Sequence, residues 1–294
     1  LRTFPMTPAL GLDPRIIALV LLAALLHASW NALLKVSKDR LTTTGLMNLT
    51  GAVAGALMLL FVASPAPASW VFILLSVLIH FGYYMFLLGS YRFGDLSQVY
   101  PLARGAAPLI VAFLSPWLVG ERLGTVQLLG VMLLCLGILS LAFNRFRWRE
   151  LVDWKPVSLA LANGCCIAAY TIADGLGVRH SASPGGYIAW LFLIDGLSMA
   201  LIAAVARRRS LASAVRSSWK PGVLGGLFAM TAYGAVIWCY SLGAIAPIAA
   251  LRETSVIIAA AIGTVLLREP FGRARILAAS CCAVGILAIN LAAH

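Results

Sequence analysis

The chain has 294 residues, of which 62% are hydrophobic and only 11% are charged, and its mean hydropathy is +0.96. Soluble domains are about half apolar and about a quarter charged, so this composition excludes an ordinary soluble protein and indicates an integral membrane protein. The formal net charge of +12 would suit a nucleic-acid partner. The basic residues, however, lie in short loops between apolar runs, so we interpret the charge as a membrane-orientation signal and expect no nucleic acid.

Ten apolar runs of about 18 to 22 residues follow one another, and each is long enough to cross a hydrocarbon core of about 30 Å as a helix. The short alternating segments that build membrane β-barrels are not seen. Residues 1–13 are not expected to be a cleaved signal peptide, because no small-residue cleavage site follows a short apolar core. The sequence predicts an all-α integral membrane protein with ten transmembrane helices, at about Ile16–Leu34, Gly45–Ala63, Trp70–Tyr91, Gln98–Val119, Thr125–Phe143, Val157–Gly177, Gly186–Ala206, Pro221–Leu242, Pro247–Leu267 and Ile276–Ala293.

Two matching stretches indicate that the chain contains two copies of one unit. Arg104 lies early in an apolar run that ends at Glu121, and Arg252 and Glu269 have the same separation of seventeen residues. A shift of 148 residues superimposes the two pairs. The two copies are expected over residues 14–144 and 156–293. Because five crossings are an odd number, the second copy enters the membrane from the opposite side, and the repeats are predicted to be inverted.

The distribution of basic residues predicts the orientation. Of the 20 Lys and Arg residues in loops and termini, 16 fall in the loops that follow the odd-numbered helices. Short cytoplasmic loops are rich in Lys and Arg, so these loops are predicted to lie in the cytoplasm and both termini outside.

Five charged side chains lie inside the predicted spans, where each costs about 2.5 to 3.5 kcal/mol unless it faces a cavity or a partner. Arg104 is placed toward the cytoplasmic mouth and Arg252 with Glu253 toward the outer mouth, so each mouth would hold one arginine. The alternative for these three is snorkelling or structural pairing. Asp174, opposite Arg252, fits a structural ion pair. Asp195, the deepest, is either a proton-linked carboxylate or a neutral acid that is hydrogen-bonded to a neighbouring helix.

Aromatic, imidazole and amide side chains recur at offsets of three, four and seven residues, which place each group on one helix face. Rings beside a few charged groups suit an organic solute with an apolar part and a charged part. Packing against neighbouring helices is the alternative for the buried His and Tyr, and Trp residues near span ends are expected to be interface anchors. The predicted substrate pathway comprises His27, Trp30, Asn31, His80, Tyr83, Tyr84, Tyr100, Arg104, Tyr170, Tyr233, Arg252 and Glu253.

Prolines, glycines and cysteines inside the spans carry separate information. Pro101, Pro108 and Pro116 interrupt the hydrogen-bond ladder of one span, so this helix is expected to kink or pivot. Glycine pairs such as Gly51 and Gly55 permit close helix approach. All six cysteines fall in apolar spans, where small packing residues are expected rather than disulfides, and no metal-binding spacing or cofactor motif is found.

The paired span ends GERLG (Gly120 to Gly124) and REPFG (Arg268 to Gly272), together with the paired arginine-bearing helices, resemble the EamA type of the drug/metabolite transporter superfamily. The resemblance covers the whole chain. As a whole, the chain is similar to the YddG-like branch. It implies two five-helix repeats, a pathway lined by helices 1, 3, 4, 6, 8 and 9, and residence in a bacterial inner membrane. It also implies export of amino acids, aromatic ones among them.

The sequence therefore favours a carrier that exports small metabolites, foremost amino acids, by alternating access, with the fourth and ninth helices as gates. A carrier for drugs, nucleosides or other organic solutes is the alternative. An intramembrane enzyme is disfavoured because the motifs GxSG, HExxH and GxGD are absent. The expected partners are a small-molecule substrate and the lipid bilayer, with no cofactor and no metal. A monomer is the working expectation, although the sequence does not decide the oligomeric state.

Overall fold

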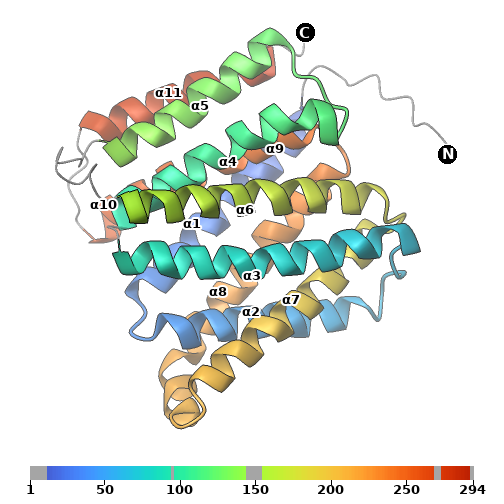
Figure 1. Cartoon of the computed structure of the whole chain (residues 1–294), viewed down its shortest axis with the longest axis vertical. Coiled ribbons are helices and arrows are strands. Elements are labelled where there is room, and N and C mark those ends of the chain that lie inside the picture. Colours follow the sequence, from blue (N-terminus) through green and yellow to red (C-terminus); the bar gives the residue numbers. More distant parts are fainter. Residues whose placement is uncertain (1–11, 94–95, 144–153, 268–272, 292–294) are drawn as a thin grey trace.

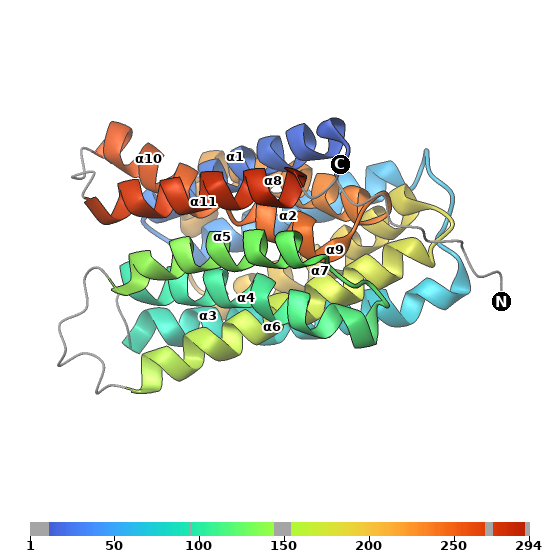
Figure 2. The ribbon, with the colours of Figure 1, turned by 90° about the horizontal axis from the view of Figure 1, so that it is seen from above.

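The structure is a computed structural model that describes residues 12–93, 96–143, 154–267 and 273–291. Within these ranges the chain forms helices that run back and forth through one bundle (Figures 1 and 2). Because α9 and α10 together make one crossing, the bundle has the ten crossings that the sequence predicts. The helices are α1 (Pro14–Val36), α2 (Arg40–Met58), the 3-10 helix η1 (Pro67–Ser69), α3 (Trp70–Phe93), α4 (Leu96–Leu118), α5 (Thr125–Phe143), α6 (Trp154–Arg179), α7 (Pro184–Ala206), α8 (Leu211–Tyr240), α9 (Ile245–Arg252), α10 (Ser255–Leu267) and α11 (Arg273–Leu291).

Eight segments of the described chain are long and apolar enough to cross a membrane, and α11 carries a shorter apolar stretch. The helix α2 is less apolar because its sequence, RLTTTGLMNLTGAVAGALM, is rich in threonine. These polar groups face protein rather than lipid, since Thr42 and Thr43 are buried and Thr44 and Asn48 line an internal cavity.

Two predicted helix starts are wrong, in both cases because polar residues extend the helix beyond its apolar run. The helix α2 begins at Arg40 rather than Gly45, since the Asp39 carboxylate caps it by accepting from the Thr42 backbone N–H at 3.2 Å. It also ends at Met58, five residues before the predicted Ala63. The helix α8 begins at Leu211, ten residues before the predicted Pro221, and this proline lies inside the helix.

The ninth crossing is broken, and the break falls at the charged residues. The helix α9 ends at Arg252, Glu253 and Thr254 leave the helix, and α10 starts at Ser255. Its counterpart α4 is assigned as one helix from Leu96 to Leu118 although it contains three prolines. The helix break is therefore found in the second repeat, next to the charged residues Arg252 and Glu253.

The contacts between α5 and α11 are related by a pseudo-two-fold axis, which also relates the two repeats. A shift of 148 residues places Gly130 on Ala278, Leu134 on Cys282 and Gly137 on Gly285. The structure packs Gly130 against Gly285 and Gly137 against Ala278, so each contact is the reciprocal of the other. At the centre the Cys282 thiol donates to the carbonyl of Leu134, its own equivalent, at 3.4 Å. Reciprocal pairing of this kind marks a two-fold contact and confirms the inverted repeats.

The remaining helix pairs follow the same symmetry. The helix α3 packs against α6, and the equivalent pair in the other repeat, α8 against α1, is also in contact. The helix α2 packs against its own counterpart α7, as α5 does against α11. Figure 1 shows α5 and α11 at one edge of the bundle and α2 with α7 at the opposite edge, with the other crossings between them. The space in the middle is therefore enclosed by helices from both repeats.

The loops divide between two ends of the bundle. At one end, which we call the basic end, Asp39 before α2 forms an ion pair with Arg207 after α7 at 3.0 Å. At the opposite end, which we call the Glu121 end, the loop between α2 and α3 is joined to the loop between α6 and α7. There the Ala66 N–H donates to the Ser181 carbonyl at 2.8 Å and the Ser183 hydroxyl donates to the Ala63 carbonyl at 2.8 Å.

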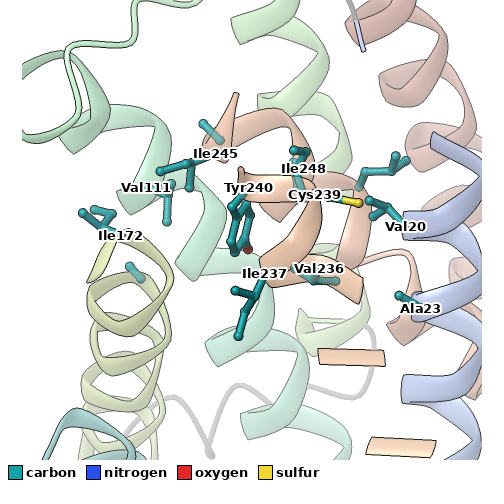
Figure 3. Packing of buried hydrophobic residues seen from close by; sticks show 14 of the residues in the cluster. Val20, Ala23, Val111, Ile172, Val236, Ile237, Cys239, Tyr240, Ile245 and Ile248 are labelled. Atoms are coloured by element: carbon teal, nitrogen blue, oxygen red, sulfur yellow. The ribbon is translucent and has the colours of Figure 1, made fainter. Parts of the chain in front are cut away.

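Part of the buried core lies near the Glu121 end, around the turn from α8 into α9. Figure 3 shows Tyr240 and Cys239 of α8 beside Ile245 and Ile248 of α9, with α1, α4 and α6 around them. All four of these side chains are 0% exposed. Lipid offers no hydrophobic drive for such contacts, so close van der Waals packing holds this core together.

Candidate functional site

A cavity of about 210 Å³ lies in the middle of the bundle. It is lined by eight helices, α1 to α4 and α6 to α9, so both repeats contribute to it. The lining reaches Arg40 and Leu41 at the basic end, and Arg40 is exposed. Toward the Glu121 end the lining stops at the level of His80 and Arg252. The cavity is thus asymmetric along the membrane normal although the repeats are symmetric.

Most of the predicted pathway residues line this cavity. Asn31, Tyr100 and Glu253 do not: Asn31 donates to the His27 carbonyl at 2.8 Å within α1, Tyr100 packs beside Arg104, and Glu253 pairs with Arg104. The nine predicted residues that do line it are His27, Trp30, His80, Tyr83, Tyr84, Arg104, Tyr170, Tyr233 and Arg252.

A cluster of stacked rings forms one wall. The His80 imidazole stacks on Tyr170 with ring centroids 4.3 Å apart and an interplanar angle of 16°. Tyr83 and Tyr233 meet His80 edge-on, at 6.3 Å and 5.8 Å. The His80 Nδ1 lies 2.9 Å from the Ser76 carbonyl, one turn back in α3, which orients the imidazole. The wall is rigid and aromatic, and it comes from α3, α6 and α8.

Arg252 projects from the end of α9 against this wall. Its guanidinium donates to the Tyr170 hydroxyl at 3.2 Å and lies over the Tyr233 ring, 5.1 Å from the centroid. The residue is only 5% exposed and it lines the cavity. Among the described residues no acidic side chain lies within ion-pair distance of it. Arg252 therefore presents a positive charge to the cavity that the surrounding rings solvate but do not neutralise.

Arg104, the repeat partner of Arg252, is neutralised. Its Nε lies 2.5 Å from a Glu253 carboxylate oxygen, and its guanidinium donates to the Ser255 hydroxyl at 3.4 Å. Both members of the pair are 3% exposed as side chains. The pair joins α4 to the break between α9 and α10. The prediction that the two arginines stand at opposite mouths is wrong, because Arg104 reaches Glu253, the residue that directly follows Arg252.

Asp174 is held by hydroxyl groups instead of the ion pair with Arg252 that we predicted. Its carboxylate accepts from the Tyr187 hydroxyl at 2.9 Å and from the Tyr233 hydroxyl. No ion pair to Asp174 is found in the described part of the chain. Tyr233 thus connects Asp174 to Arg252, because its hydroxyl binds the carboxylate while its ring faces the guanidinium.

A second wall is formed by α2 and α7, which the sequence did not place on the pathway. Asp195 of α7 and Asn48 of α2 line the cavity there, together with Tyr84 of α3. Tyr84 donates its hydroxyl hydrogen to Asn48 Oδ1 at 3.4 Å. The sequence signals that could have revealed this wall are the glycines beside it: Gly196 packs against the Asn48 carbonyl and Ala52, whereas Gly51 has open space where its side chain would be.

The Glu121 end is closed by an ionic network. Glu121, 8% exposed, lies 2.6 Å from the Arg179 guanidinium at the end of α6 and accepts from the Ile245 backbone N–H at 2.9 Å. Arg179 also donates to the carbonyls of Tyr240 and Gly243, at 2.8 Å and 2.7 Å. Four crossings, α4, α6, α8 and α9, are tied together at this point. Glu121 marked the repeat in the sequence, but its partner Arg179, at the end of α6, could not be identified without the fold.

The basic end has a single, more open ion pair. Arg207 and Asp39 are 40% and 21% exposed as side chains, and they join the start of α2 to the end of α7. The Arg207 hydrogen bonds lower the pKa of Asp39 to about 2, and the carboxylate in turn raises the pKa of Arg207. This pair lies outside the cavity. It is partly exposed, and it does not block the cavity opening as a buried ionic network would.

Comparison with known proteins gives a family and a fold. The profile of the EamA-like transporter family matches residues 14–143 and 154–291. A protein of known crystal structure is similar in fold, with a TM-score of 0.74 at 20% sequence identity over 95% of this chain and 98% of that chain. No curated protein sequence gives a significant match.

Proposed function

We propose that this chain, which belongs to the EamA-like transporter family, exports small organic solutes that carry a carboxylate. Amino acids are the foremost candidates, aromatic ones among them. The chain is a multi-pass membrane transporter of small solutes, and its family contains transporters rather than enzymes. The choice of substrate, its export by alternating access, the YddG-like affiliation and residence in a bacterial inner membrane are our proposals. Arg252 is the single observation that carries the choice of substrate.

A buried arginine without an acidic partner is costly in a membrane protein, and such residues mark substrate sites. Arg252 meets this description, since it is 5% exposed and lines the cavity, and among the described residues its guanidinium contacts Tyr170 and Tyr233 but forms no ion pair. Its planar guanidinium matches the two oxygens of a carboxylate. A solute carboxylate would supply the missing negative charge, whereas Arg104 already has Glu253.

The aromatic wall supports a solute with a flat apolar part. His80 and Tyr170 already stack on each other, and Trp30 and Tyr83 line the same space. Rings of this kind contact an aromatic side chain favourably in offset or edge-on geometry, by about 0.5 to 1.5 kcal/mol per pair. An aromatic amino acid would place its carboxylate on Arg252 and its ring against this wall.

The asymmetry of the cavity supports alternating access. The space is reached from the basic end and sealed at the Glu121 end, as expected for one of two alternating states. Basic loops favour the cytoplasmic side, so this state would load solute from the cytoplasm. A reporter fused after Arg209 should be active only as a cytoplasmic reporter and one fused after Ala182 only as an external reporter. The reverse pattern would turn the proposed export into uptake.

Counterflow in liposomes tests the proposed substrate. Purified protein should exchange phenylalanine, and Arg252→Gln should lower this exchange by at least about tenfold, since a hydrogen bond to a charged group contributes about 1.5 to 3 kcal/mol. Arg252→Lys should keep part of the rate, because it retains the charge but not the planar fork. Arg208→Gln, in an exposed loop, is the matched control and should leave exchange unchanged. Exchange of uncharged nucleosides that does not depend on Arg252 would favour the alternative carrier function instead.

A further inference from the structure

We propose that Asp195, Asn48 and Tyr84 form a second subsite of the cavity, which binds a protonated amine of the transported solute. We call these three residues the acceptor subsite. The inference rests on the proposed function, because it assumes that the cavity holds the solute. It adds a chemical requirement that Arg252 does not impose, namely a positive charge on the same solute.

Asp195 is the group that defines the subsite. It lies in the middle of α7, is partly exposed and lines the cavity. No hydrogen bond or ion pair to its carboxylate occurs within the described part of the chain, unlike Asp174, Glu253, Glu121 and Asp39, which all have partners. An acid in a membrane span without a protein partner is expensive to retain, so a transported group is the natural partner.

The neighbours of Asp195 offer more acceptors than donors, because only the second N–H of the Asn48 amide is not given to an oxygen among the described residues. The Tyr84 hydroxyl hydrogen is given to Asn48 Oδ1, and the Asn48 amide donates to the Thr44 carbonyl at 2.9 Å. Both residues line the cavity with Asp195, and the adjoining Gly196 packs on the Asn48 backbone. The phenol oxygen keeps its lone pairs, and Asn48 Oδ1 keeps one. An ammonium group has three N–H donors and no acceptor, so its chemistry complements this set.

The location of the subsite also favours an amine. Arg252 of α9 lies against the wall formed by α3, α6 and α8, and Asp195 belongs to the wall formed by α2 and α7. Trp30 of α1 lines the same cavity, and an indole ring face attracts a cation. A zwitterion bound between the two walls would have its carboxylate and its amine each facing an opposite charge. A solute with a carboxylate alone would leave Asp195 without a partner.

The test compares solutes that differ only in the amine. Counterflow is measured for phenylalanine against 3-phenylpropionate and for 5-aminopentanoate against pentanoate, with wild-type protein and Asp195→Asn at matched folded yield and Tm. The wild type should prefer the amine in at least one pair by about tenfold or more, since the amine makes charged hydrogen bonds. Asp195→Asn should remove that preference by slowing the amine solute while changing its partner less than about twofold. Asp13→Asn, an exposed acid outside the cavity, is the matched control.

Three results would overturn the acceptor subsite. Equal slowing of both members of each pair would assign Asp195 to the fold or the transport cycle. A retained preference with an altered pH dependence of flux would make it a proton site. A wild type without preference would show that the cavity does not recognise an amine. If the wild type moves none of the four carboxylates, the proposed function fails first, and phenethylamine decides the subsite: exchange that Asp195→Asn abolishes sustains it, and no exchange overturns it.

Discussion

The two ends of the bundle are built from the same repeat, yet only one of them is closed. At the Glu121 end a buried carboxylate binds an arginine, a backbone N–H and, through that arginine, two carbonyls. At the basic end the ion pair of Asp39 and Arg207 is partly exposed and stands beside a cavity that reaches Arg40. An ion pair is common to both ends, so its presence alone does not close a pathway.

The difference lies in what surrounds each pair. Arg179 is enclosed by the ends of α8 and α9, where Tyr240 and Ile245 are 0% exposed and pack as Figure 3 shows. The Arg207 side chain is 40% exposed, and its guanidinium donates to the Asp39 carboxylate at the surface. Burial raises the strength of electrostatic contacts and the cost of breaking them, whereas exposure screens them. The comparison teaches that a gate requires packed helix ends around the ion pair.

The largest effect is expected between the two ends, at the buried pair of Arg104 and Glu253. Glu253→Gln should destabilise the protein by about 3 to 5 kcal/mol, because it leaves a buried guanidinium without its counter-charge. The double variant Arg104→Gln with Glu253→Gln should recover part of this loss, since no unpaired charge is left. Thermal unfolding in detergent measures both, with Arg209→Gln as the exposed control. A single variant as stable as the wild type would mean that this pair does not hold the repeats together.

The next effect concerns the closed end. Glu121→Gln removes the ion pair with Arg179 while keeping an acceptor for the Ile245 N–H, so it should loosen the network by about 1 to 3 kcal/mol. Native Cys239, 0% exposed beside this network, can report the opening once the other five cysteines are replaced. A membrane-impermeant thiol reagent should modify Cys239 slowly in the wild type and at least several-fold faster in Glu121→Gln. Equal rates would mean that the packed core alone closes this end.

Sequence reasoning was accurate where local pattern determines structure. The span Thr125–Phe143 is confirmed at both ends, since a continuous apolar run between polar loops leaves little freedom. The inverted repeats are confirmed because the shift of 148 residues reappears as reciprocal contacts of Gly130 and Gly137. In contrast, the starts of α2 and α8 were misplaced, because capping by Asp39 and the helical stretch before Pro221 do not change the hydropathy.

The lining of the central cavity was predicted in part, for a physical reason. Ring and arginine positions could be assigned to helix faces by their spacing, and most of them line the cavity. Which arginine is neutralised could not be predicted, because Glu253 is adjacent to Arg252 in sequence but reaches Arg104 across the repeat interface. The neighbours of Asp195 could not be predicted for the same reason, because Asn48 and Tyr84 come from other helices. Contacts between helices follow from the fold, and they cannot be predicted from a single sequence.

The smallest effect is expected at the open end, where Asp39→Asn tests the comparison most directly. Asparagine caps a helix about as well as aspartate, so this variant keeps the cap of α2 and removes only the charge that faces Arg207. The Tm at pH 7 should change little, because the pair is exposed and screened, and thiol reactivity of Cys239 should not change at all.

The sign of the pH dependence follows from the folded pKa of Asp39, which is about 2 and thus below its value of about 3.9 in an unfolded chain. A depressed pKa stabilises the fold above about pH 4, and this contribution is lost as the pH falls toward 2. The small difference between wild type and Asp39→Asn should therefore vanish over that window. A loss of stability as large as that of Glu121→Gln would mean that the basic end is a closed gate too, and that exposure does not distinguish the two ends.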